Sequence, residues 1–157
     1  MIINKSKNSS RNDSRPLDIL NEAHQNAREF FATVDISNAH PVATGYKGGV
    51  PKIIMVMPPV RMPEADPQVV ALAQDMLKAY GCDCLVFFYP VQFEPANQDA
   101  PVEHGVIVEV QSKGGFSIKR LLRLEGNVKG RNVLSAALPV LGKGYGLYYP
   151  NLIDEVV

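Results

Sequence analysis

The chain has 157 residues, of which 46% are hydrophobic and 20% charged, and its formal net charge at pH 7 is zero. This length and composition fit one globular domain with a single core, and they exclude wholesale disorder and a fibrous repeat. The longest apolar runs, 53–57 and 84–89, are much shorter than the roughly 20 residues that a membrane-spanning helix needs. We therefore expect no membrane association. The lysines near the N-terminus are not followed by the apolar stretch of a secretory signal, so we expect a cytoplasmic protein.

The charged residues are unevenly distributed along the chain. Residues 1–15 carry four basic side chains against one acidic, in a setting rich in Ser and Asn. This composition predicts a flexible basic arm over 1–15, followed by a single α+β domain over 16–157. Residues 61–112 have a net charge of −6, and residues 113–131 have a net charge of +5. The basic residues of the last segment are Lys113, Lys119, Arg120, Arg123, Lys129 and Arg131.

The first predicted element is an amphipathic helix over 16–33. Pro16 suits the first helical turn, where its missing N–H would have no partner. Apolar residues then recur at steps of three and four, which is the spacing of one buried helix face. The Gly- and Pro-rich segment 40–52 is interpreted as a loop. The apolar run that follows predicts a strand covered on both faces, ended by Pro58 and Pro59.

A second helix is indicated between Asp66 and Gly81. Asp66 is a good N-cap, Pro67 suits the first helical position, and Gly81 lies where a left-handed C-terminal residue is favoured. The expected buried stripe is Val69, Leu72, Ala73, Met76, Leu77 and Tyr80. Another continuously apolar strand follows over 84–89. Strand, helix and strand with short links are typical of a βαβ unit, so we expect these two strands to be parallel neighbours.

A hairpin is predicted around Gly114 and Gly115, because two β-prone runs flank this pair and tight turns need positive φ. If both glycines are the central turn residues, Glu109 lies opposite Arg120. Such an exposed cross-strand ion pair contributes at most about 1 kcal/mol. The same register places Gln111 opposite Ile118, and Val108 opposite Leu121.

Beyond this hairpin, Asn132 is interpreted as the cap of a short helix that Pro139 would end. The complete pattern predicts an α+β fold in one domain. Its elements are a mixed β-sheet of about four to five strands with a βαβ unit, a β-hairpin in the C-terminal half, and two main helices.

Metal and cofactor sites have weak support in the sequence. Cys82 and Cys84 could form a zinc site only together with His40 and His104, and the spacings match no standard ligand pattern. Cys84 is expected to be a buried strand residue. We therefore expect no metal and no cofactor.

One segment suggests catalysis. Residues 105–113, with Asp99 upstream, carry two acidic residues and a lysine near the end of a predicted strand. This arrangement resembles the core of restriction-endonuclease-like proteins, in which a PD motif precedes (D/E)-x-K. The resemblance implies a metal-dependent nuclease with Asp99, Glu109 and Lys113 as site residues. Gln111 stands where that motif has its lysine, and Lys113 lies two residues further along the strand.

The main functional hypothesis is a non-catalytic interaction or regulatory protein that contacts a partner through a basic hairpin. The partner is expected to be a nucleic acid, because cations neutralise phosphates, or an acidic protein surface. Its candidate binding residues are the six basic side chains of 113–131. Two alternatives stay open. One is the nuclease, and the other is a structural homo-oligomer stabilised by pairing of acidic and basic surfaces.

Overall fold

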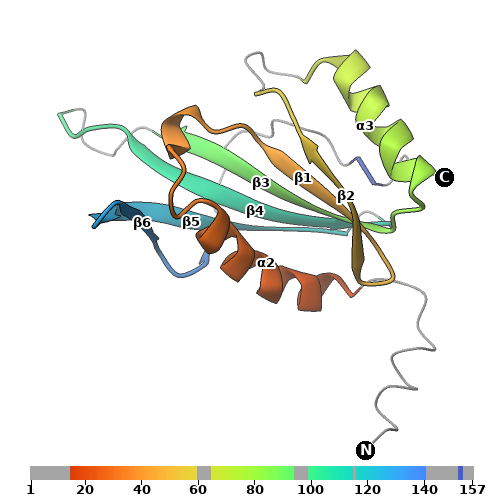
Figure 1. Cartoon of the computed structure of the whole chain (residues 1–157), viewed down its shortest axis with the longest axis horizontal. Helices are drawn as coiled ribbons and strands as arrows, with labels where there is room; N and C mark the ends of the chain where they lie inside the picture. The colour runs from red at the N-terminus through yellow and green to blue at the C-terminus, as the bar shows by residue number, and fades with distance from the viewer. Residues whose placement is uncertain (1–14, 60–64, 94–98, 115, 141–151, 154–157) are drawn as a thin grey trace, which may run out of the picture.

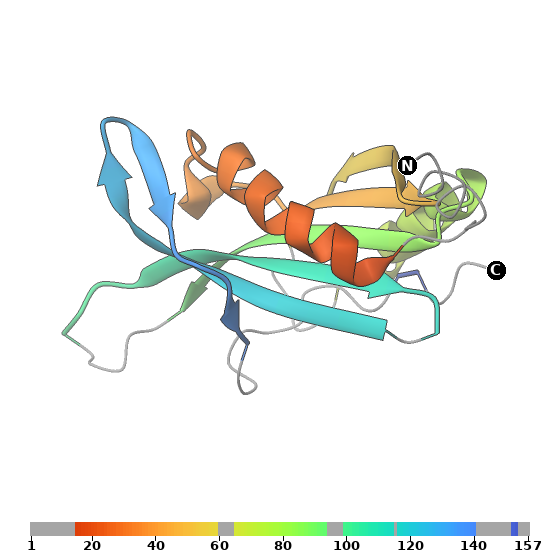
Figure 2. The same ribbon diagram turned by 90° about the horizontal axis from the view of Figure 1, so that it is seen from below.

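A computed structural model describes residues 15–59, 65–93, 99–114, 116–140 and 152–153. One sheet dominates this part of the chain (Figure 1), with the order β2-β1-β3-β4-β5-β6 and with β7 paired to β5. All pairings between described strands are antiparallel. The sheet curls into a half-barrel, as Figure 2 shows from below. The strands are β1 (Val42–Lys47), β2 (Val50–Val56), β3 (Cys84–Phe93), β4 (Glu103–Ser112), β5 (Phe116–Val128), β6 (Arg131–Leu134) and β7 (Leu138–Pro139).

The predicted mixed sheet of about four to five strands with a βαβ unit is wrong, because the described strands form a seven-stranded sheet in which all pairings are antiparallel. The two strands expected to be parallel neighbours, β2 and β3, are separated by β1, which pairs antiparallel with both. Strand β1 comes from the segment interpreted as a loop. Its Gly45 is buried within the strand, and Gly48 and Gly49 form the turn to β2 with φ of 58° and 81°. The loop interpretation of 40–52 is therefore wrong for most of this segment, and the two glycines form the tight turn of a hairpin, since two successive positive φ values suit a two-residue turn.

The two main helices lie on opposite faces of the sheet. Helix α2 (Pro16–Phe30) confirms most of the helix predicted over 16–33, and a 3₁₀ turn, η1 (Ile36–Asn38), follows it. Helix α3 (Pro67–Ala79) begins as expected, because the Asp66 carboxylate accepts a hydrogen bond from Gln68 N at 2.9 Å. Gly81 after this helix has a φ of +66°. Neither described helix has the length and apolar character needed to span a membrane.

The core has one layer on each face of the sheet. On the face covered by α2, side chains of β3, β4 and β5 such as Phe88, Val108 and Leu122 pack against Ala23 and Ala27. On the α3 face, Phe87 and Ile107 pack with Leu77 and with Leu152–Ile153. Strand β3 is therefore buried on both faces, which explains its continuous apolar run without a parallel sheet.

Helix α3 buries a narrower face than its pattern predicts. Ala73 and Leu77 are buried, and Val69 and Val70 pack partly against the core. By contrast, Leu72, Met76 and Tyr80 are 63%, 37% and 48% exposed. The buried stripe of α3 is therefore confined to Ala73 and Leu77, with Val69 and Val70 at its border.

The hairpin between β4 and β5 forms, but its predicted register is shifted by one residue. Ser112 pairs with Phe116, so residues 113–115 form a three-residue connection. Glu109 consequently lies opposite Lys119, and the predicted pairing of Glu109 with Arg120 is wrong. Because side chains alternate along a strand, a shift of one residue also places Arg120 on the opposite face of the sheet from Glu109.

Candidate interaction surface

The hairpin of β5 and β6 projects from the sheet (Figure 2). Val128 pairs with Arg131, so Lys129 and Gly130 form a two-residue turn, with φ of 54° and 80°. A register shift between Leu124 and Gly126 bends β5 just before this turn. The hairpin forms where a short helix starting at Asn132 was predicted, so that prediction is wrong. Two successive positive φ values place a tight turn at Lys129 and Gly130, and the residues from Arg131 continue as strand β6 instead of a helix.

Asn132 fixes this hairpin to the end of α2. Its side-chain Nδ2 donates hydrogen bonds to Phe31 O at 2.7 Å and to Val34 O at 2.8 Å. Its backbone N donates to Ala32 O at 2.7 Å. Asn127 across the strand pair donates to Asn132 Oδ1 at 3.1 Å. These contacts hold the orientation of the hairpin, because a displaced Asn132 would leave partly buried carbonyls without donors.

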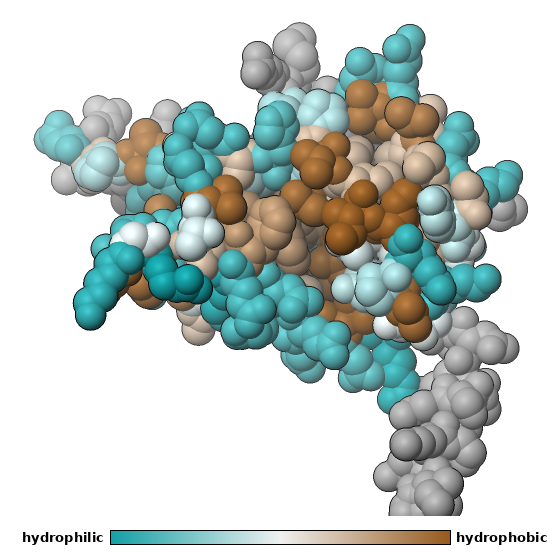
Figure 3. Space-filling view, in the orientation of Figure 1, coloured by the Kyte–Doolittle hydropathy of each residue, from teal (hydrophilic) through white to brown (hydrophobic). Residues whose placement is uncertain are grey.

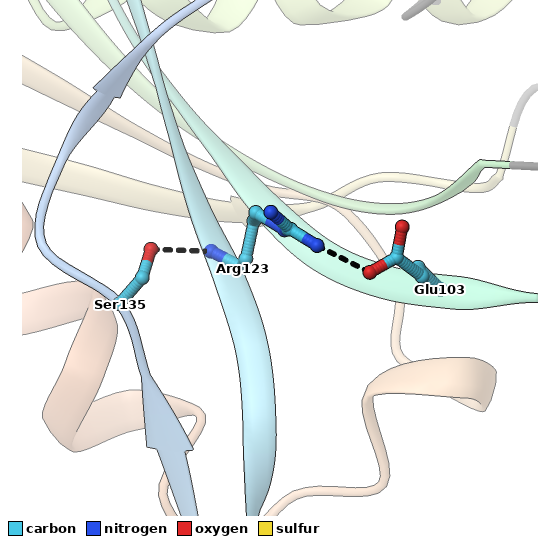
Figure 4. Close-up of polar contacts among 3 residues, drawn as sticks. All are labelled: Glu103, Arg123 and Ser135. Atoms are coloured by element: carbon cyan, nitrogen blue, oxygen red, sulfur yellow. Dashed lines mark hydrogen bonds and ion pairs between the residues drawn. The ribbon is translucent and has the colours of Figure 1, made fainter. Parts of the chain in front are cut away.

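A second set of contacts fixes the base of the hairpin (Figure 4). Arg123 N donates to Ser135 Oγ at 2.9 Å, and Ser135 N donates to Arg123 O at 2.8 Å. Ser135 Oγ also donates to Ala136 O at 2.8 Å. The Arg123 side chain forms an ion pair with Glu103 of β4. Arg123 therefore links β4, β5 and the segment after β6.

At the tip of the hairpin, basic and apolar side chains lie together. Lys129 and Arg131 are exposed, and neither forms an ion pair with another described residue. Val128 is 59% exposed and Val133 is 41% exposed. We call Val128, Lys129, Arg131 and Val133 the hairpin tip.

The six basic residues singled out from the sequence do not form one patch. Lys113 is in the turn before β5, and Lys129 is in the turn after it. Strand β5 has 13 residues and so separates these two side chains by roughly 40 Å. Between them, Lys119 and Arg120 lie on opposite faces of the sheet, and Arg123 is paired with Glu103. Only Lys129 and Arg131 share one local surface.

The three residues of the nuclease hypothesis do not converge either. Asp99 precedes β4 and Lys113 follows it, so the ten residues of this strand separate them by about 30 Å. Glu109 lies between them and is 3% exposed. Its Oε2 accepts a hydrogen bond from Ser117 Oγ at 2.7 Å, while Oε1 is buried without a hydrogen-bond partner among the described residues. No group of three metal-ligating side chains occurs in the described ranges.

The two cysteines are separated by the sheet. Cys82 packs in the α3-side core and Cys84 in the α2-side core. Burial raises the pKa of the Cys84 thiol to about 12, with a smaller contribution from the nearby charge of Asp83. Cys84 is therefore a neutral core residue at physiological pH.

His40 contacts Met57 O through Nδ1 at 3.3 Å, and His104 lies at a cavity of about 200 Å³ that Ile36, Val91 and Gln92 also line.

Asn132 was not identified as a functional residue from the sequence. Its position could have been found from the pair Lys129-Gly130 between Val128 and Val133, which is a turn signal between β-branched residues. Its partners could not, because Phe31 and Val34 lie about 100 positions away.

No protein-family model, curated protein or solved structure matches this chain.

Proposed function

We propose that this chain is a non-catalytic interaction protein that binds an acidic protein surface through the hairpin tip. The observation that carries the proposal is the combination of two cations, which form no ion pair with a described residue, and two exposed valines on a hairpin that Asn132 holds in place. Protein interfaces commonly combine apolar area with charges that steer the partner. The cytoplasmic location expected from the sequence stays a prediction within this proposal.

Charge distribution favours an acidic protein over a nucleic acid as the partner. Nucleic-acid binding draws its affinity from several cations that contact phosphates along one surface. Here Lys113, Lys119 and Arg120 lie at other places or faces of the sheet, and Arg123 is paired with Glu103. A tip with two cations and two valines fits a small acidic surface with apolar neighbours.

The test uses a fluorescently labelled polyglutamate peptide and a labelled DNA duplex as probes for the full-length chain. The variant Lys129→Glu/Arg131→Glu reverses both tip charges, and Lys47→Glu/Lys113→Glu makes the same change outside the tip. We expect the tip variant to weaken peptide binding by roughly tenfold or more, since each charge contact contributes about 1 kcal/mol. The control variant should bind the peptide like the unmodified chain.

Fluorescence anisotropy at two salt concentrations measures both probes. Equal peptide affinity in the tip variant and the unmodified chain would contradict the proposal. Tight DNA binding that depends on Lys129 and Arg131 would instead identify a nucleic-acid partner.

A second candidate function, self-association, is favoured by strand β2, which pairs with no described strand on its outer side. Strand β2 ends the strand order, and its Ile54 and Val56 are 68% and 70% exposed. Figure 3 shows hydrophobic surface in the region between α2 and α3, where Figure 1 draws β2. An exposed edge strand with apolar side chains can pair with the same strand of a second copy. Pro51 and Lys52 limit such pairing to the second half of β2.

Sedimentation velocity over a range of protein concentrations tests this candidate. We expect the unmodified chain to form dimers, and Val56→Lys to shift the equilibrium to monomer by tenfold or more in the dissociation constant. Val133→Lys is the matched control, because it changes an exposed valine of another strand. A chain that stays monomeric at all concentrations excludes self-association through β2.

A further inference from the structure

Three nitrogen-bearing side chains, His24, Arg28 and Arg120, lie on the same side of the sheet, between α2 and β5. His24 and Arg28 are one helical turn apart, so both lie on the same side of α2. Arg120 lies in β5. The residues two positions before and after it, Ile118 and Leu122, pack in the α2-side core. Arg120 therefore points to the face of the sheet on which α2 lies.

No described acidic side chain forms an ion pair with this group. The ion pairs Arg15–Asp18 and Arg123–Glu103 do not include a member of the group. The neighbouring side chains of β4 and β5 on this face are apolar, and so are Leu134 of β6 and Ala137 after it. Those of β4 and β5 are Val106, Val108, Val110, Ile118, Leu122 and Leu124. The titratable residue of β4 on this face is His104, and its side chain carries no negative charge.

Both arginines are held by backbone carbonyls. Arg28 Nη2 donates to Ser135 O at 3.1 Å, and Arg120 Nη1 donates to Lys119 O at 2.8 Å. A guanidinium has five N–H donors, so each arginine keeps further donors for another acceptor. Both side chains are also half-buried, which limits their solvation.

His24 adds an unsatisfied polar atom to the group. Its Nε2 is buried and has no hydrogen-bond partner among the described residues. Burial lowers the pKa of His24, and the positive charges of Arg28 and Arg120 lower it further. The imidazole is therefore neutral at pH 7 in the unliganded chain, and a bound anion would favour its protonated, donating form.

We propose that His24, Arg28 and Arg120 form a binding site for a phosphate group. Two guanidinium groups and an imidazolium match the charge of a phosphate dianion better than that of a single carboxylate. The phosphate group comes either from inorganic phosphate or from a small phosphate monoester, because both present the same oxygens. This site is independent of the hairpin tip and of the β2 edge.

The test follows the ring resonances of the three histidines by NMR in the full-length chain between pH 5 and pH 8. Titrations with inorganic phosphate and with phenyl phosphate are compared with chloride at equal ionic strength. We expect phosphate to raise the pKa of His24 and to leave the ring resonances of the other two histidines in place. Tighter binding of phenyl phosphate supports a monoester ligand, and equal or weaker binding supports free phosphate.

Two variants separate a specific site from general charge attraction. Arg120→Gln should weaken phosphate binding by about tenfold or more, because it removes a charge-assisted donor. Lys119→Gln removes the same charge from the adjacent residue on the opposite face, and it should leave the affinity unchanged. The proposal is overturned if phosphate does not change the pKa of His24, or if both variants weaken binding equally.

The site also predicts how phosphate changes stability with pH. Without phosphate, the lowered pKa of His24 means that the unfolded chain binds a proton below pH 6.5 more readily than the folded chain. As the pH falls below 6.5, protonation of His24 therefore favours the unfolded chain, and the free energy of unfolding decreases. Phosphate should reduce that decrease, and thermal unfolding at pH 5.5 and pH 7.5 measures it. His24→Gln should abolish the pH-dependent part of the phosphate effect, and a persisting effect would contradict the role of His24.

Discussion

Replacing Gly105 with alanine should lower the free energy of unfolding by more than about 2 kcal/mol. A Cβ at this position in β4 would lie 2.7 Å from Leu122 O and 3.1 Å from Leu121 Cδ1. The first of these atoms belongs to the backbone of β5, so it cannot move away as a side chain could. Relief requires a shift between two central strands, and overpacking of this kind typically destabilises by 1–3 kcal/mol or more.

The matched control is Gly126→Ala in β5. A Cβ there meets no atom within 4 Å, and Gly126 has no positive φ. Alanine should therefore leave the stability unchanged or raise it by a few tenths of a kcal/mol, since it restricts the unfolded chain. Urea denaturation followed by circular dichroism compares both variants. Equal stability of the two variants would show that β4 and β5 are not as close at Gly105 as described.

Replacing Asn132 with alanine should destabilise the chain by about 2–3 kcal/mol and release the β5–β6 hairpin. The change removes the donors to Phe31 O and Val34 O, both partly buried, and a buried acceptor left without a donor costs about 1–3 kcal/mol. Asn132→Asp keeps the shape of the side chain but has no N–H donor at neutral pH. We expect it to be at least as harmful as alanine.

Hydrogen exchange and urea denaturation together test this role of Asn132. Backbone amides of β6 should lose protection in both Asn132 variants, while those of β3 and β4 should change only with global stability. Asn127→Ala is the control, because it removes only one exposed hydrogen bond in the same hairpin. A rigid hairpin in Asn132→Ala would show that other contacts orient it. Binding of the acidic peptide should also weaken in Asn132→Ala, although both tip charges remain.

The helices were the most predictable part of this fold because their signals are local. Asp66, Pro67 and Gly81 each act on backbone groups within one helical turn, so their effect does not depend on the rest of the chain. The strand over 53–57, predicted to be covered on both faces, is instead the edge strand β2, whose Ile54 and Val56 are 68% and 70% exposed. The apolar run 84–89 correctly indicated a strand, and β3 is buried on both faces. It did not show which elements cover those faces, since α2 and α3 would cover a parallel or an antiparallel strand equally well.

The two Gly-Gly pairs show where local signals become insufficient. Gly48-Gly49 forms a two-residue turn between β1 and β2, although it lay in a segment interpreted as a loop. Gly114-Gly115 was predicted to form such a turn, but the connection there has three residues. A difference of one residue moved the partner of Glu109 from Arg120 to Lys119. It also placed Arg120 toward α2, next to His24 and Arg28.

The sequence by itself determined the two helices, the presence of the hairpin after β4, the buried character of β3 and the concentration of basic residues in 113–131. These features depend on propensity, capping and composition, which act over a few residues. Only the tertiary structure decided that β1 lies between β2 and β3, and that Asn132 meets the end of α2. It also decided that Arg123 pairs with Glu103 while Lys129 and Arg131 stay exposed. Strand order, register and charge pairing arise from contacts between distant segments, and those contacts depend on how both layers of the core pack against one sheet.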